Sequence, residues 1–341
     1  MLTPRALGFR MPAEWEPHEA TWLAWPHERE DWPGRFAPIP WVYAEIVRKL
    51  SRVERVRILV QDSELENSAR RVLSRAGAHM PAVEFYCYAT DRVWTRDYAP
   101  LFVKNAAGEV AITNWRFNGW AKYDNYRRDD AVPSRLAELL QLRMWSPDMV
   151  LEGGSIDGNG AGLLLTTEDC LLSPVQARNP KLSREAIEKT LSDYLGADRV
   201  LWLNRGIAGD DTHGHIDDIA RFADPDTVVL VLESDPGEIN YEPLQENFER
   251  LQQYPLRVVP LPMPAPLYFR GRRLPASYAN FYIANDLVLA PTFNDPQDRI
   301  ALNTLAELFP SRQVTGINCT DLIWGLGAIH CMSQQQPAKL K

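Results

Sequence analysis

Short apolar runs rich in β-branched residues recur along the whole chain, and segments with helical periodicity separate them. Runs of this kind are typical of buried strands. The sequence predicts strands at 56–60, 83–88, 162–166, 227–232, 257–261 and 281–290, the last of which is interrupted at 285–286. Because strands and helices alternate, the chain is expected to fold as a mixed α/β protein.

Amphipathic patterns predict helices at 43–50, 64–76, 132–142, 183–195, 243–254 and 298–308. In the fourth of these, Ala186 and Leu191 fall on one face, Ser183 can cap the start, and Gly196 can end it. The strand and helix units return at roughly 50- to 60-residue intervals, but their sequence similarity is too faint to define a repeat. The spacing by itself does not fix a topology.

The length of 341 residues is compatible with two domains or with one large domain. Neither a Gly/Ser-rich linker nor a low-complexity tract divides the chain, and the proline-rich stretch 260–266 is short enough to be an ordered extended loop. We therefore expect a single catalytic domain over residues 1–341.

The balance of 37 basic against 45 acidic residues gives a net charge of −8, which argues against a nucleic-acid partner. Such a charge favours cationic ligands, although moderate acidity is also common in proteins that simply need to be soluble. No run approaches the roughly 18 apolar residues of a membrane span, and the N-terminal residues do not resemble a signal peptide. We expect no membrane partner and a cytoplasmic location.

The four cysteines have no CxxC spacing, so they are expected to be free thiols rather than part of a zinc ribbon or a disulfide scaffold. The chain also lacks GxGxxG, GxxxxGK[ST] and GxSxG motifs, which removes support for nucleotide chemistry and for a serine nucleophile elbow. Polar residues instead interrupt apolar runs at four places, namely 94–97, 152–154, 213–218 and 329–331.

The segment 213–218 reads HGHIDD, and an HxHxD pattern also opens the ligand set of binuclear metallohydrolases. One alternative is therefore a metal site on His213, His215 and Asp217. That ligand set needs further histidines, which the four other histidines do not supply, and position 218 is an aspartate. A structural role for these residues as turn caps is a second alternative.

Taken together, the polar motifs resemble those of the agmatine deiminase family, which includes bacterial peptidylarginine deiminases and belongs to the guanidine-modifying superfamily. The resemblance is nearly full length. It rests on MPAEWEPHEATWLAWP at 11–26, WTRDYAP at 94–100, FNGW at 117–120, LEGGSID at 151–157, TTEDCLL at 166–172, RNPKLSREAIE at 178–188, GDDTHGHIDDIARF at 209–222, PASYANFYIAN at 275–285 and GAIHCMSQQQP at 327–337.

This resemblance implies a five-bladed α/β propeller with pseudo-fivefold symmetry and an active site in its central channel. Cys331 matches the nucleophile of the family, His215 its general acid and base, and Glu152 the carboxylate that pairs with the histidine. A lone cysteine after an apolar stretch is more often buried and inert, so the assignment of Cys331 depends on the family pattern.

Asp97 and Asp217 match the carboxylates that bind the guanidinium group in the family. A guanidinium remains charged at physiological pH and offers a planar fork of N–H donors, which carboxylates can bind in bidentate fashion. Alone, Asp97 could equally form a surface ion pair and Asp217 a helix cap. Trp94 and Trp120 are expected to contact the substrate by stacking, or else to belong to the core.

The chain departs from the family pattern close to two of these motifs. Ala99 stands where the family has glycine, and Leu326 and Ala328 stand where it has glycine and asparagine. Leu326 and Ala328 flank the nucleophile. We therefore expect these departures to affect the placement of the backbone near Cys331 and the contacts with the substrate beyond its reacting carbon.

The resemblance implies hydrolysis of agmatine to N-carbamoylputrescine and ammonia through a covalent amidino intermediate on Cys331, with no metal and no cofactor. The alternatives are an arginine or peptidylarginine deiminase of the same mechanism, the metallohydrolase above, and a non-catalytic propeller that serves as a binding module. The expected partner is a small cationic guanidine substrate, and a homodimer is plausible because such assemblies are common.

Overall fold

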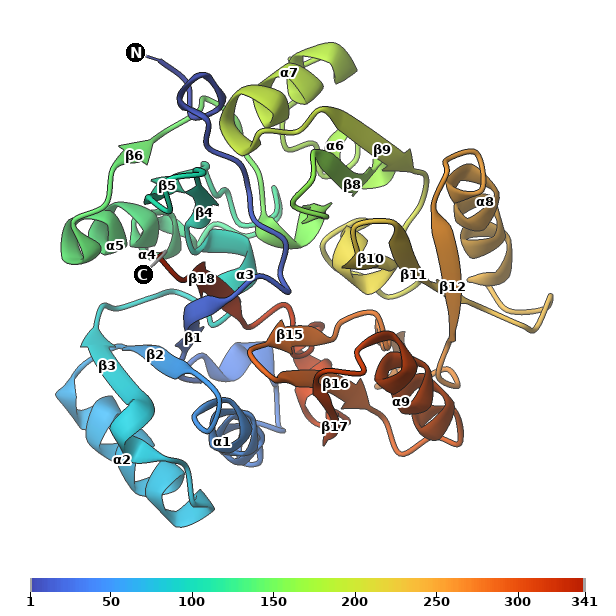
Figure 1. The fold of residues 1–341 in the computed structure, drawn as a ribbon. Coiled ribbons are helices and arrows are strands. Elements are labelled where there is room, and N and C mark those ends of the chain that lie inside the picture. The colour runs from blue at the N-terminus through green and yellow to red at the C-terminus, as the bar shows by residue number, and fades with distance from the viewer. Residues whose placement is uncertain (1, 340–341) are drawn as a thin grey trace.

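The structure is a computed structural model, and it describes residues 2–339 of the chain. Within this range, five mixed β-sheets form a ring around a central axis, and the longer helices lie on the outside of the ring (Figure 1). A separate two-stranded hairpin consists of β13 (Tyr268–Phe269) and β14 (Arg272–Arg273).

Four of the five sheets share one strand pattern, in which the middle strand pairs antiparallel with the first and parallel with the third. In chain order their strands are β4 (Leu101–Lys104), β5 (Val110–Thr113) and β6 (Met144–Trp145); β7 (Asp157–Gly158), β8 (Leu163–Thr167) and β9 (Arg199–Leu203); β10 (Ala220–Asp224), β11 (Thr227–Leu232) and β12 (Arg257–Pro262); and β15 (Tyr282–Ala284), β16 (Leu287–Thr292) and β17 (Gln313–Asn318).

Helices connect the parallel strands of each sheet, as parallel pairing requires a crossover. They are α4 (Arg127–Asp130) and α5 (Val132–Leu140) before β6, α6 (Glu168–Leu171) and α7 (Arg184–Leu195) before β9, α8 (Tyr241–Leu251) before β12, and α9 (Gln297–Leu308) before β17. The unit of two antiparallel strands, a helix and a parallel strand is the repeat that the sequence spacing indicated only faintly.

The fifth sheet joins the two ends of the chain and closes the ring. Its order is β18 (Gln334–Pro337), β1 (His18–Ala24), β2 (Arg55–Val60) and β3 (Val83–Cys87). The antiparallel pairing of β18 with β1 sets Trp22 opposite Gln334, and helices α1 (Ile39–Leu50) and α2 (Ser63–Ala76) connect its parallel strands. The C-terminal segment therefore lies beside the N-terminal one at the centre (Figure 1).

All the predicted strands and helices are present, and their boundaries shift for identifiable reasons. The run 281–290 forms two strands, β15 and β16, because the backbone turns at Asp286, which has a φ of +55°. Helix α1 begins at Ile39, earlier than expected, because a proline is tolerated in the first turn. Helix α5 ends at Leu140 because Gln141 is left-handed. The first part of the proline-rich stretch belongs to edge strand β12, where prolines are tolerated.

The apolar core fills the space between the sheets and the helices that cover them. Strands β11 and β16 are almost entirely buried, which explains their continuous apolar sequences. No helix within residues 2–339 is long and apolar enough to cross a membrane. The expectation that residues 1–341 form a single catalytic domain remains a prediction.

Candidate active site

The site residues lie in the segments that precede the first strand of each three-stranded sheet, and in the segment before β18. Asp97 lies on the short helix α3 (Thr95–Tyr98) before β4, and Cys331 lies before β18. Glu152 precedes the turn η4 (Gly153–Ser155) before β7, and His215 precedes the turn η5 (Ile216–Asp218) before β10. Because the five sheets form a ring, these segments meet at its centre, and all four of these side chains are buried.

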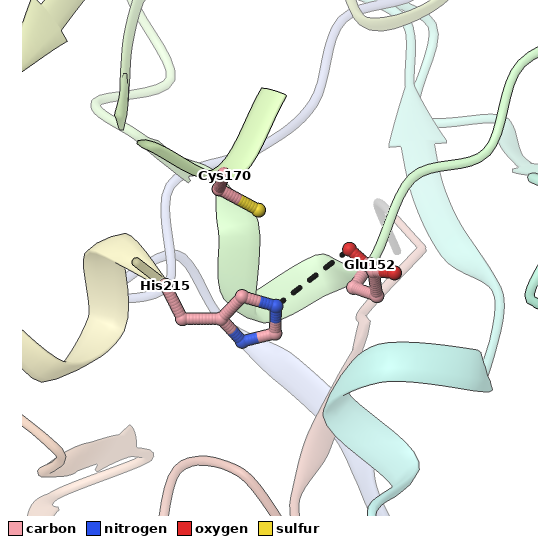
Figure 2. A group of neighbouring side chains, drawn as sticks. All are labelled: Glu152, Cys170 and His215. Carbon is pink, nitrogen blue, oxygen red and sulfur yellow. Dashed lines mark ion pairs between the residues drawn. The ribbon is translucent and has the colours of Figure 1, made fainter. Parts of the chain in front are cut away.

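His215 is surrounded by carboxylates. Its Nε2 lies 3.6 Å from Glu152 Oε2 (Figure 2). Its Nδ1 lies 3.7 Å from Asp97 Oδ1 and 3.9 Å from Asp217 Oδ1. Burial opposes a charged imidazole, but Asp97 and the other acidic neighbours outweigh it and raise the pKa of His215 well above its usual value. The geometry therefore favours a protonated His215 in the empty site.

Glu152 is held in the ionised state by Arg178, which donates from Nε to Oε1 at 3.1 Å. Burial opposes this charge, but Arg178 and His215 together lower the pKa of Glu152 to about 2. Sequence analysis did not single out Arg178, although it lies within the matched RNP segment. Arg178 therefore fixes one oxygen of this buried carboxylate and leaves Oε2 beside His215.

The two glycines after Glu152 are required by the close packing of this centre. A Cβ on Gly154 would lie 2.6 Å from His215 Nδ1 and 2.7 Å from Asp97 Oδ1. A Cβ on Gly153 would lie 2.2 Å from the carbonyl oxygen of Arg96. The sequence Glu-Gly-Gly therefore brings a carboxylate to the centre on a backbone that has no side chains in the way.

The two carboxylates predicted to bind a guanidinium are both present at the centre, each fixed by a different donor. Trp120 Nε1 donates to Asp97 Oδ2 at 2.8 Å, and Gly154 N donates to Asp97 Oδ1 at 3.0 Å. Burial raises the pKa of Asp97 to about 6, against the opposing effect of His215. Asp217 Oδ2 lies 2.7 Å from His330 Nδ1, and this contact lowers the pKa of Asp217 despite its burial.

Several buried polar atoms at the centre have no hydrogen-bond partner within residues 2–339. They are Glu152 Oε2, Asp217 Oδ1 and both ring nitrogens of His215. Leaving such groups unsatisfied costs free energy, so unpaired acceptors in a buried site indicate a ligand that supplies donors. Two carboxylate oxygens that lack donors fit a cation with several N–H groups.

Cys331 Sγ receives a hydrogen bond from Asn280 Nδ2 at 3.0 Å and lies 3.8 Å from Asp217 Oδ2. Burial, together with Asp217, Asp218 and Asp97, raises the pKa of the Cys331 thiol well above its usual value. The empty site therefore favours the neutral thiol, and Asn280 is a donor that can stabilise the thiolate.

Sequence analysis missed Asn280, which completes the fivefold pattern because it lies in the segment before β15, two residues from its start. Its Oδ1 also accepts from the backbone N–H groups of His330 and Cys331, at 2.9 and 3.3 Å. One amide thus fixes both the sulfur and the backbone of the cysteine segment. Its position within the matched motif was visible in the sequence, but its role required the ring geometry.

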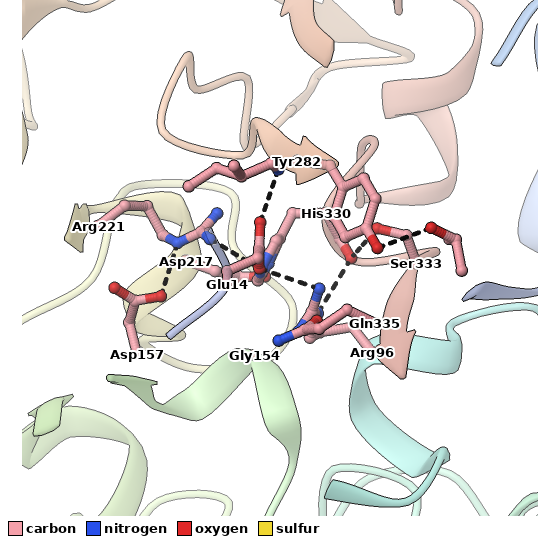
Figure 3. A network of polar contacts seen from close by, with 12 residues as sticks. Glu14, Arg96, Gly154, Asp157, Asp217, Arg221, Tyr282, His330, Ser333 and Gln335 are labelled. Carbon is pink, nitrogen blue, oxygen red and sulfur yellow. Dashed lines mark hydrogen bonds and ion pairs between the residues drawn. The ribbon is translucent and has the colours of Figure 1, made fainter. Parts of the chain in front are cut away.

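A buried ion network lies behind the site and fixes Asp217 (Figure 3). Glu14 Oε2 lies 2.8 Å from His330 Nε2, 2.9 Å from Arg221 Nη2 and 3.2 Å from Arg96 Nη2. His330 therefore bridges Glu14 and Asp217. Sequence analysis assigned no role to Glu14, Arg96 or Arg221, because contacts between such distant segments cannot be inferred from local pattern.

A cavity of about 380 Å³ leads from the surface to Cys331 and Asp97. Trp94 and Trp120 line this cavity and also pack in the core, so their contact with a substrate stays a prediction. Trp22 and Trp25, from the first matched motif, also belong to the core. The further lining residues include Glu30, Asp31, Arg92, Tyr123, Asp211, Phe269, Arg270, Arg272, Trp324 and Leu326. Its size suits a small elongated molecule.

The residues that depart from the family pattern differ in their backbone conformations. Leu326 has a φ of +69°, a left-handed conformation that favours glycine, and its side chain lines the cavity. Ala99 has a φ of −70°, so no glycine is needed there. Ala328 is buried, and its backbone N–H favours the thiolate form of Cys331. The departures therefore leave the reacting groups in place.

The alternative metal set on His213, His215 and Asp217 is not assembled. His213 Nε2 lies 3.2 Å from Ser173 Oγ and 3.3 Å from Asp169 Oδ1, and its side chain is a quarter exposed. It faces a surface groove, whereas His215 and Asp217 face the centre. The structure therefore disfavours the metallohydrolase alternative.

Solved structures with the same fold include agmatine deiminases. This chain matches the agmatine deiminase of Enterococcus faecalis with a TM-score of 0.92 at 34% identity, covering 100% of this chain and 99% of that one. It matches a serine-for-cysteine variant of the C. jejuni agmatine deiminase with substrate bound, with a TM-score of 0.90 at 30% identity over 98% and 97% of the two chains. These matches confirm the predicted five-bladed α/β propeller.

Sequence comparison leads to the same group of proteins. The agmatine deiminase of Pseudomonas aeruginosa (strain UCBPP-PA14) is 36% identical over 99% of this chain and 98% of its own length. The family model described as Porphyromonas-type peptidyl-arginine deiminase matches residues 10–337. The predicted family is thereby confirmed: the chain belongs to the Porphyromonas-type peptidyl-arginine deiminase family.

Proposed function

We propose that this chain is an agmatine deiminase, which converts agmatine and water to N-carbamoylputrescine and ammonia. The observation that carries the proposal is that Cys331 and Asp97 line a cavity of about 380 Å³, while the buried His215 lies within 4 Å of Asp97 and of the carboxylates of Glu152 and Asp217. Agmatine deiminases of the same fold, one of them with substrate bound, and an agmatine deiminase 36% identical in sequence support it.

The guanidinium binds between Asp97 and Asp217. The unpaired oxygens Asp217 Oδ1 and Glu152 Oε2 accept N–H groups of this cation, and the oxygens of Asp97 keep the donors that orient them. Hydrogen bonds to oxygens of separate, rigidly held carboxylates fix the planar group, so the central carbon faces Cys331 Sγ. Trp94 and Trp120 enclose the chain of the substrate.

The bound cation favours ionisation of Cys331. In the empty site, burial and the surrounding carboxylates hold the pKa of the thiol high. A guanidinium cation adjacent to the sulfur has the opposite effect, and each pKa unit corresponds to about 1.4 kcal/mol. The substrate thus helps to generate the nucleophile that attacks it, and the amide of Asn280 assists.

The thiolate of Cys331 adds to the guanidinium carbon, forming a C–S bond. His215 then donates a proton to one terminal nitrogen, and the C–N bond breaks to release ammonia. The neutral imidazole takes a proton from a water molecule that attacks the same carbon, and the C–S bond breaks to give the ureido product. Glu152 orients His215 and stabilises its charged form.

One observation favours a second candidate, arginine or a peptidyl arginine, as substrate. Among the arginines that line the cavity, Arg92 pairs with Asp31 and Arg272 with Asp211, whereas Arg270 has no carboxylate partner within residues 2–339. An unpaired arginine at the mouth can bind the carboxylate of arginine or a peptide carbonyl. Agmatine lacks both groups and carries an ammonium instead.

The test is ammonia release from agmatine, arginine and a blocked peptidyl arginine, measured with the wild type and with Cys331→Ala in the presence of EDTA. We expect turnover of agmatine that disappears in the variant. Preferential turnover of arginine or the peptide would contradict agmatine as the substrate but would agree with the proposed mechanism. An equal rate in Cys331→Ala would overturn the mechanism, and silence on all three substrates would favour a binding module.

A further inference from the structure

Cys170 lies beside the guanidine site, yet the proposed reaction does not use it. It belongs to helix α6 and is 1% exposed. Its sulfur, one nitrogen of His215 and one oxygen of Glu152 all lie within 4.8 Å of one another (Figure 2). A thiol, an imidazole and a carboxylate therefore face one another in a fully buried space.

Two atoms of this cluster have no hydrogen-bond partner within residues 2–339. They are Glu152 Oε2 and His215 Nε2, which lie 3.6 Å apart. Both side chains are almost fully buried, so neither atom is satisfied by bulk water. An unpaired nitrogen, an unpaired carboxylate oxygen and a nearby sulfur are the donor types that zinc prefers in proteins.

We propose that Glu152, Cys170 and His215 bind one zinc ion, and that the bound ion inhibits the enzyme. Three protein ligands leave the fourth tetrahedral position for water, as in open zinc sites. The charges of a thiolate and a carboxylate balance that of the metal. When the metal binds, the thiol of Cys170 and the protonated imidazole of His215 each lose a proton to solvent.

The surroundings hold each ligand in a suitable orientation. Asp97 Oδ1 lies 3.7 Å from His215 Nδ1, beyond hydrogen-bond distance but on the side of the ring away from the zinc, where a carboxylate typically accepts from a zinc-bound histidine. Arg178 occupies Glu152 Oε1 and leaves Oε2 for the metal. The backbone N–H of Cys170 donates to Thr167 Oγ1 at 3.0 Å, which anchors the start of helix α6.

A second buried cluster, formed by Asp217, Asp218 and Cys331, has similar spacing but is less suited to zinc. Asp217 Oδ2 contacts His330, and the amide of Asn280 donates to both Asp218 and Cys331. A metal there would have to displace these hydrogen bonds. The cluster also lacks an imidazole, so the observations favour the site on Cys170.

The inhibitory effect rests on the proposed function. Zinc would bind His215, which transfers protons in the reaction, and Glu152, which orients His215. The enzyme therefore cannot bind zinc and catalyse the reaction at the same time. Zinc is not part of the deimination, and chelation is expected to restore activity. Metal binding itself can be measured without any turnover.

The test uses cobalt as a spectroscopic substitute for zinc in full-length Cys331→Ser, which lacks the nucleophilic thiol. We expect one equivalent of Co²⁺ to produce a near-ultraviolet thiolate-to-metal band and visible bands of tetrahedral cobalt, which Zn²⁺ then removes. Adding Cys170→Ser should abolish the thiolate band and weaken binding at least ~10-fold. The matched control, Cys331→Ser with Cys87→Ser, removes an exposed thiol and should retain the band.

A thiolate band that persists without Cys170, or that is absent from Cys331→Ser, would overturn the proposal. The variant Cys170→Ala provides a second test if the serine variant unfolds. In the wild type, Zn²⁺ should inhibit ammonia release from agmatine, and EDTA should reverse the inhibition. Because the cobalt spectra do not depend on turnover, failure of the zinc site and failure of the proposed function give different results.

Discussion

The hydrogen bond from Asn280 to the nucleophile makes a quantitative prediction for Asn280→Ala. Asn280 Nδ2 donates to Cys331 Sγ at 3.0 Å, among carboxylates that disfavour the thiolate. A hydrogen bond to a charged group contributes about 1.5–3 kcal/mol. At about 1.4 kcal/mol per unit, its loss should raise the pKa of the Cys331 thiol by about 1 to 2 units.

The assay is the pH dependence of alkylation by iodoacetamide in a Cys87→Ser background, which removes the exposed thiol. Intact-protein mass spectrometry at each pH follows modification of Cys331. The midpoint should move to higher pH by about 1 to 2 units in Asn280→Ala, as worked out from the hydrogen bond. Ammonia release from agmatine should fall in parallel at neutral pH.

A control separates this electrostatic effect from a shift of the cysteine segment. Asn280 Oδ1 also accepts from the backbone of His330 and Cys331, so the alanine variant loses those contacts too. Asn280→Asp keeps an oxygen acceptor but no longer offers the amide donor, and it should raise the midpoint at least as far. An unchanged midpoint in both variants would refute the reasoning about the thiolate, even if activity fell.

Three further predictions concern the same site. Gly154→Ala should lower kcat about 100-fold, because the added Cβ would lie 2.6 Å from His215 Nδ1 and 2.7 Å from an oxygen of Asp97. Steady-state kinetics measures this effect, and an unchanged far-UV circular dichroism spectrum shows that the variant is folded. Arg221→Met should lower the free energy of unfolding by about 3–5 kcal/mol, because it removes the cation that pairs with buried Asp157 and leaves buried Glu14 with Arg96 and His330 only. Urea titration measures the change. The pKa of Asp97 is about 6, and only the ionised carboxyl binds a guanidinium as a salt bridge. A pH profile of kcat/KM should therefore fall as pH drops through this range, because kcat/KM reports ionisation in the free enzyme.

Much of the fold could be predicted from local sequence pattern. Buried strands such as β11 and capped helices such as α7 carry strong local signals. Strand β18, with the sequence QQQP, carries none, because its place depends on pairing with β1 at the other end of the chain. The closure of the ring therefore could be expected from the family resemblance, but not from the residues themselves.

The five groups proposed to act in catalysis and guanidinium binding were all expected from the motifs, and the structure brings them together. The residues that support them were not expected, because the contacts are long-range. Arg178 contacts Glu152 across a loop, and Glu14 contacts His330 from the opposite end of the chain. His213 and His215 look equivalent in sequence, but His213 has a left-handed backbone and a side chain that is a quarter exposed, whereas His215 is buried.

The central claim is that Cys331 forms a covalent bond with the guanidinium carbon. The most direct measurement is mass spectrometry of the wild type, quenched with acid during turnover of agmatine. The account predicts a mass increase equal to agmatine minus ammonia, located on the peptide that contains Cys331 and absent from Cys331→Ala. Turnover without any adduct, or an adduct on Cys170, would contradict it.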